Sequence, residues 1–210
     1  MTLFKYNKYK SIESSHLWLD NKILSIIKNM SCKDIIDIGC GNGNFVSRLY
    51  KEGHKVTGID AELSGIEIAR KNYKNINFFQ YSIYDNPSNL KIEKADLITS
   101  IEVIEHLFKP DELLIFSKHF LKSNGKLILS TPYYGSYIKN LFCSIFNKWD
   151  DQFTVLWDGG HIKFFSLKTL RKILEKSGFK IVSYKICNKK YPFLNHIWPH
   201  NIIIIAELQN

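Results

Sequence analysis

The stretch DIIDIGCGNGNF, residues 34–45, decides the fold. Its first five residues include three isoleucines, which is typical of a short buried strand, and glycines follow at positions 39, 41 and 43. Glycines in such a turn let the backbone bend tightly and let a ligand approach it closely. The next residues, Asn44–Glu52, have the pattern of a helix. The sequence therefore predicts a strand, a ligand-binding turn and a helix in direct succession.

Strand-like and helix-like segments alternate along the rest of the chain. The predicted strands are Asp34–Ile38, Lys55–Ile59, Ile76–Phe79, Ala95–Ser100, Lys126–Ser130, Phe179–Ile186 and Asn201–Leu208. The predicted helices are Ser14–Met30, Asn44–Glu52, Glu62–Tyr73, Pro110–Leu121 and Leu167–Ser177. This alternation predicts an α/β protein with parallel strands and helices on both faces of a doubly wound sheet. The last two strands are joined without a helix and are expected to pair antiparallel at one edge.

The length of 210 residues and the apolar fraction of 45% suit one folded unit of ordinary size with a sizeable core, so we expect a single domain over residues 1–210. An N-terminal helix is expected at 14–30. The segment 132–161 interrupts the alternation and is rich in Tyr, Phe and Trp, including Trp157. A long insertion of this kind is either a functional lid or a packed helical decoration, and we leave both open.

Charge and cysteine content limit the class of protein. The formal net charge is +9, yet arginine occurs only at positions 48, 70 and 171, so we expect a lysine-rich surface and disfavour nucleic acid binding without excluding it. No apolar run approaches the roughly 20 residues of a membrane span. The polar start of the chain does not resemble a secretory signal, and four scattered cysteines suit a reducing compartment, so a cytoplasmic location is expected.

A carboxylate after the second strand points to a nucleoside-containing cofactor. Asp60 ends that strand, where it can accept hydrogen bonds from both hydroxyls of a ribose. The glycine spacing is G-x-G-x-G, and Asn44 stands where the dinucleotide fingerprint G-x-G-x-x-G requires its third glycine. Asp37 directly before the turn suits a cationic amino group and would repel a pyrophosphate. S-adenosylmethionine therefore fits better than a nicotinamide dinucleotide.

These residues resemble the class I S-adenosylmethionine-dependent methyltransferases, and most closely the group that contains the ubiquinone-biosynthesis O-methyltransferases. The resemblance spans roughly residues 34–183. It is carried by Asp37–Gly43, by Asp60, by the run Ser-Ile-Glu-Val-Ile-Glu-His-Leu at 100–107, and by His-Ile-Lys-Phe-Phe-Ser at 161–166. It implies a Rossmann-like, mostly parallel sheet of seven strands whose last strand is antiparallel.

The resemblance also implies roles for individual residues. The cofactor would be bound by Asp37, Gly39, Gly41, Gly43, Asp60, Ala61, Ser82, Ile83 and Ile101. In this set Asp60 would hold the ribose, Ala61 and Ser82–Ile83 would border the adenine, and Ile101 would lie near the methionyl end. The arginine that the family carries upstream of the glycine motif has no evident counterpart in Ser14–Met30.

Glu102, Glu105 and His106 follow the fourth predicted strand and are the catalytic candidates. At helical spacing their side chains can converge on one face. Methyl transfer requires an aligned donor and a nucleophilic acceptor oxygen, and His106 is the natural base to deprotonate a hydroxyl. The alternative without a catalytic role is that the two glutamates form a solvated, acidic start of a helix and that His106 contributes only to packing.

A divalent ion such as Mg²⁺ is the alternative to a base alone. His161 joins Glu102, Glu105 and His106 as a set of oxygen and nitrogen ligands for such an ion, which would lower the pKa of the hydroxyl directly. The Glu-x-x-Glu-His run is similar to the metal-binding run of some ubiquinone O-methyltransferases and, with a later His, to that of small-RNA 2'-O-methyltransferases. We favour the base alone slightly over the metal.

The sequence therefore predicts an S-adenosylmethionine-dependent methyltransferase that acts on a hydroxyl of a small-molecule acceptor. The alternatives are an N- or C-methyltransferase of a metabolite or sugar, an RNA 2'-O-methyltransferase, and a non-catalytic nucleoside-binding scaffold that kept the fold. The acceptor and the oligomeric state do not follow from the sequence.

Overall fold

The computed structural model describes residues 17–150, 152–153 and 160–209. The predicted helix start at 14–16 and Trp157 of the predicted lid lie outside these residues. The strands are β1 Asp34–Ile38, β2 Lys55–Asp60, β3 Asn77–Gln80, β4 Ala95–Ile101, β5 Leu121–Pro132, β6 Phe179–Cys187 and β7 Asn201–Leu208. The α-helices are α1 Leu17–Ile27, α2 Asn44–Lys51, α3 Leu63–Asn72, α4 Pro110–Phe120, α5 Tyr137–Ile145 and α6 Leu167–Lys176. Short 3-10 helices are η2 Pro87–Asn89, η3 Ile104–His106 and η4 Pro192–Leu194.

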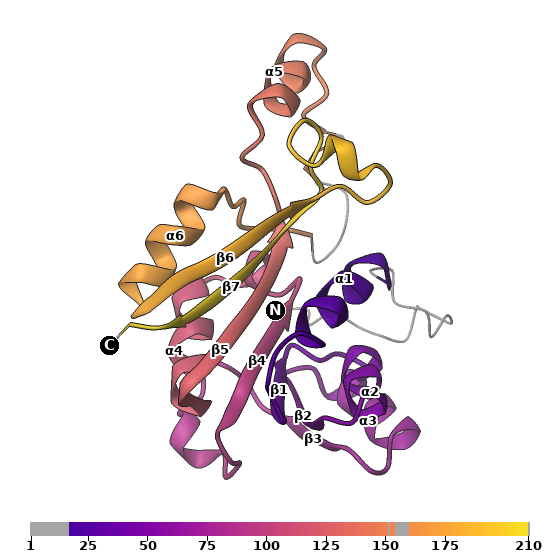
Figure 1. Ribbon diagram of the computed structural model, residues 1–210, viewed down its shortest axis with the longest axis vertical. Helices are drawn as coiled ribbons and strands as arrows, with labels where there is room; N and C mark the ends of the chain where they lie inside the picture. Colours follow the sequence, from indigo (N-terminus) through magenta and orange to yellow (C-terminus); the bar gives the residue numbers. More distant parts are fainter. Residues whose placement is uncertain (1–16, 151, 154–159, 210) are drawn as a thin grey trace. The chain divides into compact units, whose positions relative to one another are not determined.

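The strands form one seven-stranded sheet in the order β3-β2-β1-β4-β5-β7-β6 (Figure 1). β1 pairs in parallel with β2 and with β4, and β2 pairs in parallel with β3. β6 and β7 pair antiparallel, with a register shift between Ile181 and Ser183. The predicted α/β class and the antiparallel last strand are therefore confirmed. The strand order reverses between β1 and β4, which is where open α/β sheets bind their ligands.

The chain divides into two compact units. The first consists of Met1–Ser100 and Ile115–Leu127, and the second of Ile101–Leu114 and Ile128–Asn210. The prediction of a single domain stays a prediction. Within the described parts of both units, no helix combines the length and the hydropathy that crossing a bilayer requires.

The first unit is built on short strands rich in isoleucine. Ile35, Ile36 and Ile38 of β1 and Ile98 of β4 are at most 3% exposed, because strands with covered faces bury both rows of side chains. α2 and α3 pack against β2. Asp96 of β4 fixes the start of β1. Its carboxylate accepts hydrogen bonds from the backbone N–H groups of residues 33 and 34 at 2.9 Å. These bonds and the Lys122 ammonium hold the pKa of Asp96 down at about 2.

The second unit is built around the β6–β7 hairpin. α6 packs on β6, with Leu170 and Leu174 fully buried at helical spacing. Ser166 caps α6 by accepting a hydrogen bond from the backbone N–H of Thr169, whose own side chain accepts from the N–H of Ser166. This capping box explains why the helix begins at Leu167, as its pattern predicts.

Two differences from the sequence prediction matter for the site, while most other boundaries shift by one to three residues. β5 begins at Leu121 rather than Lys126, because the Lys122 ammonium, 2.7 Å from Asp34 and 2.8 Å from Asp96, holds this stretch to the edges of neighbouring strands. The run at 102–106, expected at helical spacing, contains the 3-10 turn η3 instead. This second difference changes which side chains meet in the candidate site.

Candidate functional site

The glycine turn, Gly39–Gly43, connects β1 to α2 in the first unit. Gly39, Gly41 and Gly43 have φ angles of 81°, 53° and 80°, a region that side chains with a Cβ rarely adopt. The backbone N–H groups of Gly39 and Cys40 donate to the carbonyl of Ile59 at 2.8 and 3.1 Å. The turn is therefore bound directly to the end of β2.

Gly43 has a packing requirement as well as a conformational one. A Cβ at this position would lie 2.8 Å from Phe78 Cζ and 3.0 Å from Ala69 Cβ, both closer than ordinary contact. α3 and β3 thus approach the turn so closely that only a glycine fits.

Asp60 holds the turn from the end of β2. Its Oδ2 accepts a hydrogen bond from the Gly41 N–H and its Oδ1 accepts one from the Glu62 N–H, both at 2.8 Å. Burial raises the pKa of Asp60, and these two hydrogen bonds act in the opposite direction. The carboxylate that the sequence assigns to a ribose is thus already oriented by backbone donors, in a partly exposed position.

The predicted adenine-bordering residues lie on loops of the same unit. Ala61 is exposed, and its carbonyl accepts a hydrogen bond from Gln80 Nε2 at 3.2 Å. Ser82 and Ile83 are partly exposed and follow β3, where the Tyr81 N–H donates to the Asp60 carbonyl at 2.8 Å. Ile101 is the last residue of β4 and the first residue of the second unit.

Asp37 is a buried carboxyl directly before the turn. It is 3% exposed and its Oδ1 accepts a hydrogen bond of 2.5 Å from Thr99 Oγ1 on β4. Burial raises the pKa of Asp37 to about 7, although the Thr99 hydrogen bond opposes this. A carboxyl that titrates near neutrality can release its proton when a cationic group approaches.

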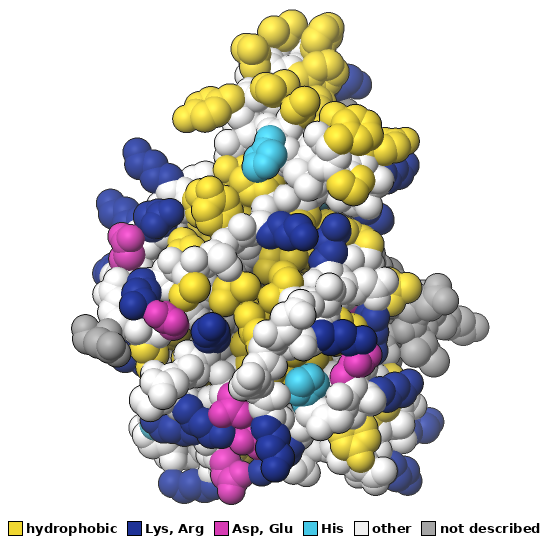
Figure 2. All heavy atoms as spheres, viewed as in Figure 1, with side chains coloured by type: hydrophobic (Ala, Val, Ile, Leu, Met, Phe, Trp, Pro, Cys, Tyr) yellow, Lys and Arg dark blue, Asp and Glu magenta, His cyan; other side chains and the backbone are white. Residues whose placement is uncertain are grey.

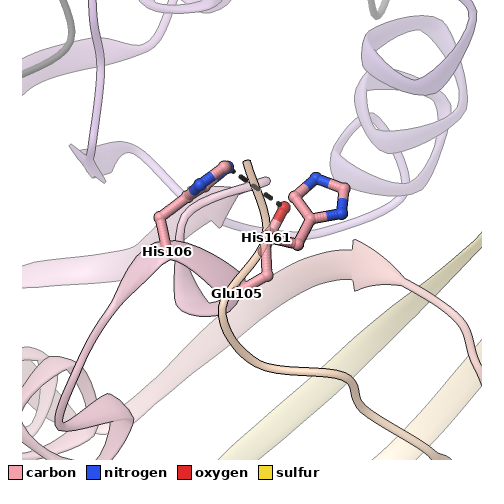
Figure 3. A group of neighbouring side chains, drawn as sticks. All are labelled: Glu105, His106 and His161. Atoms are coloured by element: carbon pink, nitrogen blue, oxygen red, sulfur yellow. Dashed lines mark ion pairs between the residues drawn. The ribbon is translucent and has the colours of Figure 1, made fainter. Parts of the chain in front are cut away.

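The second unit brings Glu105, His106 and His161 together, and we call these three residues the histidine cluster (Figure 3). One ligand atom from each lies within 4.8 Å of the others. His106 Nε2 is 3.9 Å from Glu105 Oε1, and the two imidazole rings are 5.1 Å apart between centroids. Residues from a turn after β4 and from the segment before α6 thus meet at one point.

Glu105 is the buried member of the histidine cluster. Its Oε2 accepts a hydrogen bond from Thr131 Oγ1 at 2.9 Å, whereas Oε1 is buried and has no hydrogen-bond partner among the described residues. Burial, and secondarily the charge of Glu102, raises the pKa of Glu105 well above its ordinary value. A buried carboxyl oxygen without a hydrogen-bond partner can bind a proton or a cation.

Main-chain hydrogen bonds bring His161 to Glu105. The carbonyl of Glu105 accepts from the N–H groups of Ile162 and Lys163, both at 3.0 Å. The Tyr134 hydroxyl lies 3.0 Å from His161 Nδ1, within hydrogen-bonding distance. Burial, with added repulsion from Glu105 and Glu102, raises the pKa of Tyr134 to about 12, so this hydroxyl stays neutral.

Glu102 lies outside the histidine cluster. Its backbone is left-handed with φ of 56°, and its carboxylate accepts hydrogen bonds from Ser130 Oγ at 3.0 Å and from Asn201 Nδ2 at 2.7 Å. The expected convergence by helical spacing fails for this residue, because the left-handed backbone and the 3-10 turn after it replace the helix. Glu102 instead joins the ends of β5 and β7.

A stack of aromatic side chains extends from the histidine cluster along the 132–161 segment. Trp149 and Phe153 stack at 5.5 Å between ring centroids, and Phe153 stacks on Tyr134 at 5.7 Å. Phe164 meets the edges of both Tyr134 and Phe153. Since Tyr134 also contacts His161, the stack continues directly from the cluster.

Sequence reasoning assigned no role to several hydrogen-bonding residues. They are Thr99, Ser130, Thr131 and Asn201. A usable signal existed for three of them, since Thr99, Ser130 and Thr131 are polar residues within or at the end of otherwise apolar strands. Buried hydroxyls at such places need partners, and the nearby carboxylates provide them.

A family model described as "Methyltransferase domain" matches residues 14–184. The ubiquinone biosynthesis O-methyltransferase of Rickettsia canadensis (strain McKiel) is 34% identical over 118 residues, covering 54% of this chain and 49% of that protein. The enzyme of the same name from Actinobacillus pleuropneumoniae serotype 5b (strain L20) is 36% identical over 106 residues, covering 47% and 45%. The chain therefore spans about half the length of these curated relatives.

Solved structures share the fold at low sequence identity. An S-adenosylmethionine-dependent methyltransferase from Clostridium acetobutylicum ATCC 824 has a TM-score of 0.69 and 16% identity, covering 98% of this chain and 96% of that one. Magnesium protoporphyrin IX methyltransferase from Synechocystis PCC 6803, solved with bound S-adenosylhomocysteine, has a TM-score of 0.65 and 17% identity, covering 93% and 84%.

The glycine turn at the reversal of strand order, the antiparallel last strand and the matched family model agree with one another and with the resemblance seen in the sequence. This chain belongs to the methyltransferase domain family and has the class I methyltransferase fold.

Proposed function

We propose that this protein transfers a methyl group from S-adenosylmethionine to a hydroxyl oxygen of a small-molecule acceptor. The observation that carries the proposal is the histidine cluster, in which the His106 imidazole lies 3.9 Å from a buried carboxyl oxygen of Glu105 that has no hydrogen-bond partner in the described part of the chain. Such a pair suits proton removal from a hydroxyl. The O-methyltransferase names of the curated relatives support the same chemistry.

Eight of the nine proposed cofactor-binding residues lie in the first unit, and Ile101 belongs to the second. Asp60 would accept hydrogen bonds from the ribose, and the positive-φ glycines would let the methionyl part approach the backbone. Asp37 would receive the amino group, while Ala61, Ser82, Ile83 and Ile101 complete the proposed contacts. When bound, the sulfonium supplies an activated methyl group, and the electrons of the broken carbon–sulfur bond stay on sulfur to give S-adenosylhomocysteine.

The proton of the acceptor hydroxyl would pass to His106. The His106 side chain is 32% exposed, so it can reach an acceptor, whereas Glu105 behind it is fully buried. Glu105 is held by Thr131 and keeps the imidazole oriented. Tyr134 would orient His161 by the hydrogen bond at Nδ1.

The same three residues fit a divalent cation. Glu105, His106 and His161 offer one oxygen and two nitrogens, a donor set that divalent ions accept. The cation would also contact Glu105 Oε1, which has no hydrogen-bond partner among residues that the structure describes. A bound cation would supply Lewis acidity that lowers the pKa of the acceptor hydroxyl. Glu102, bonded to Ser130 and Asn201, would act on such an ion through its charge.

Cofactor binding is tested by calorimetry with S-adenosylhomocysteine. We expect Asp60→Ala to weaken binding by roughly ten- to hundred-fold, because charge-assisted hydrogen bonds to the ribose are lost. Glu67→Ala, an exposed change on α3, is the matched control and should bind normally. Normal affinity in Asp60→Ala would contradict this assignment, and no binding by the unaltered protein would favour a scaffold without this cofactor.

The reaction is tested by measuring S-adenosylhomocysteine formation over a panel of acceptors. Phenols and sugar hydroxyls should be methylated, whereas turnover of amines, of carbon acids or of RNA in their place would identify one of the alternative methyltransferases. Chelation followed by Mg²⁺, Mn²⁺ or Zn²⁺ addition tests the cation. A rise in melting temperature with one ion, absent in Glu105→Gln, supports it, and an unchanged rate and melting temperature after chelation would eliminate it.

We propose further that the two units act as one catalytic domain and that the protein works in the reducing cytoplasm. The compartment is supported by Cys32, Cys40, Cys143 and Cys187, none of which forms a disulfide with another described cysteine. Cell fractionation with an antibody to the protein tests the location directly.

A further inference from the structure

The strand β6 forms one edge of the sheet. It is the last strand in the sheet order, and among the described strands it pairs only with β7. Figure 1 shows β6 at this border of the sheet, with α6 beside it. An edge strand presents a row of main-chain N–H and C=O groups that can pair with another chain. Because β6 has nine residues, this row is long.

The centre of β6 is accessible from outside the sheet. The four consecutive residues Val182–Lys185 are exposed, and the side chains of Val182 and Tyr184 are 49% and 46% exposed. Successive side chains of a strand point to opposite faces, so neither face of this stretch is fully covered. The register shift between Ile181 and Ser183 falls beside this stretch, and a bulge of this kind bends a strand locally. Another chain can therefore reach the middle of β6.

One side of α6, which packs on β6, is positively charged. Three basic residues, Arg171, Lys172 and Lys176, lie three, four and eight residues after Lys168, so the four share one side of the helix. All four are exposed, and none forms an ion pair with another described residue. We call these four residues the α6 stripe. Figure 2 shows Lys and Arg side chains on the surface over α6.

The positive charge continues from α6 into β6. Residues 163–190 contain nine lysines and arginines and a single acidic residue, Glu175. On β6, Lys180 is paired with Glu207 at 3.0 Å, whereas Lys185 is exposed and forms no ion pair with a described residue. Two copies of this edge would bring like charges together, which disfavours pairing between them. The same charge favours a segment that carries carboxylates.

The chemistry of this edge fits a peptide better than a nucleic acid. Arg171 is the only arginine among the nine basic residues of 163–190, and phosphate recognition depends largely on the guanidinium group. Main-chain donors and acceptors in a row, by contrast, match the backbone of an extended peptide. The exposed Val182 and Tyr184 between lysines also resemble the apolar centre and charged rim of protein interfaces.

We propose that β6 binds an extended, acidic segment of another protein as an additional strand of the sheet. The main chain of this segment would pair with the outer edge of β6, and its apolar side chains would contact Val182 and Tyr184. Its carboxylates would lie near Lys185 and the α6 stripe. This inference does not depend on the proposed methyl transfer.

The test is fluorescence anisotropy of a labelled peptide of alternating Glu and Val, with nine residues to match β6, titrated with the purified full chain. We expect binding that added salt weakens. The same peptide with methylated backbone nitrogens cannot donate hydrogen bonds and should bind more than about tenfold more weakly. Arg171→Glu combined with Lys172→Glu should cause a similar loss. Lys51→Glu combined with Lys71→Glu makes the same charge change at exposed positions of α2 and α3 and should bind like the unaltered protein.

Four outcomes overturn the proposal. They are no binding of the peptide, equal binding of its methylated form, an equal loss in the control variant, and tighter binding of single-stranded RNA that displaces the peptide. The second would mean that charge alone attracts the peptide, and the fourth that the surface binds phosphates. The comparison of the two peptides uses the unaltered protein, so it does not depend on the folding of a variant. Affinity for S-adenosylhomocysteine should be the same in all variants, which separates this result from that of the proposed function.

Discussion

The glycine turn and the histidine cluster are assembled in opposite ways. The turn is made by residues close together in the chain, and Asp60 and Ile59 engage its N–H groups. The cluster needs His161, brought from a distant segment by main-chain hydrogen bonds, and it keeps one carboxyl oxygen of Glu105 without a hydrogen-bond partner among the described residues. The turn is therefore sensitive to added volume, whereas the cluster is sensitive to loss of a polar group.

Removing His106 should have the largest effect. We expect His106→Ala to reduce the initial rate of methyl transfer about 10²- to 10⁴-fold, because a general base contributes this much. Affinity for S-adenosylhomocysteine, measured by calorimetry, should stay unchanged. His119→Ala, an exposed histidine on α4, serves as the control. Equal losses of rate in both variants would remove His106 from the proposed mechanism.

Asp37 should make stability depend on pH. Its pKa is raised from 3.8 to about 7 in the folded protein, so the folded state binds the proton more tightly than the unfolded state. The resulting stability is fully present below pH 3.8 and is lost as pH rises through 7. Relative to Asp37→Asn, the unaltered protein should lose at most about 4 kcal/mol of unfolding free energy across this window.

Urea unfolding at several pH values between these limits measures the Asp37 effect. Asp85→Asn, at an exposed position, is the control and should follow the pH profile of the unaltered protein. If the profiles of Asp37→Asn and the unaltered protein run parallel, the buried carboxyl does not titrate in this range.

Gly43 tests the volume sensitivity of the turn. Gly43→Ala should lower the free energy of unfolding by about 3 kcal/mol, because it combines a positive φ with a Cβ crowded by Phe78. Gly53→Ala is the matched control, since Gly53 has φ of 94° with nothing within 4 Å of an added Cβ, and it should cost about 1 kcal/mol. Equal losses in chemical denaturation would mean that Phe78 moves aside.

Tyr134 should give the smallest effect. Tyr134→Phe removes the hydroxyl beside His161 Nδ1, and we expect about 1 kcal/mol of lost stability and a few-fold lower rate, the usual contribution of one hydrogen bond. Tyr50→Phe, at an exposed position on α2, controls for loss of a hydroxyl. A rate loss as large as that of His106→Ala would instead place the Tyr134 hydroxyl among the reacting groups.

The contrast between turn and cluster also explains what the sequence could predict. The turn and most strand boundaries agree within two residues, because glycine positions and isoleucine runs act locally. The start of β5 was missed since Lys122 reaches Asp34 and Asp96, partners distant in the chain. Local patterns do not encode contacts of that kind.

The residues of the candidate site could also be predicted from local patterns, whereas their contacts with distant residues could not. Glu105 and His106 are neighbours in the sequence, and His161 was included because it precedes the sixth-strand unit and adds a second imidazole to the set of possible ligands. Glu102 departs from the expectation because its left-handed backbone turns the side chain toward Ser130 and Asn201. No residue pattern near position 102 signals a φ of that sign in a glutamate.

The two hydrogen bonds from residues 162 and 163 to the Glu105 carbonyl involve main-chain atoms alone. Their formation does not depend on which side chains occupy the preceding insertion. Apart from Tyr134, whose hydroxyl contacts His161, the stretch between β5 and His161 can therefore change in length and composition during evolution without displacing the imidazole. The preference for an acceptor can therefore change by replacement of this segment, while the histidine cluster stays in place.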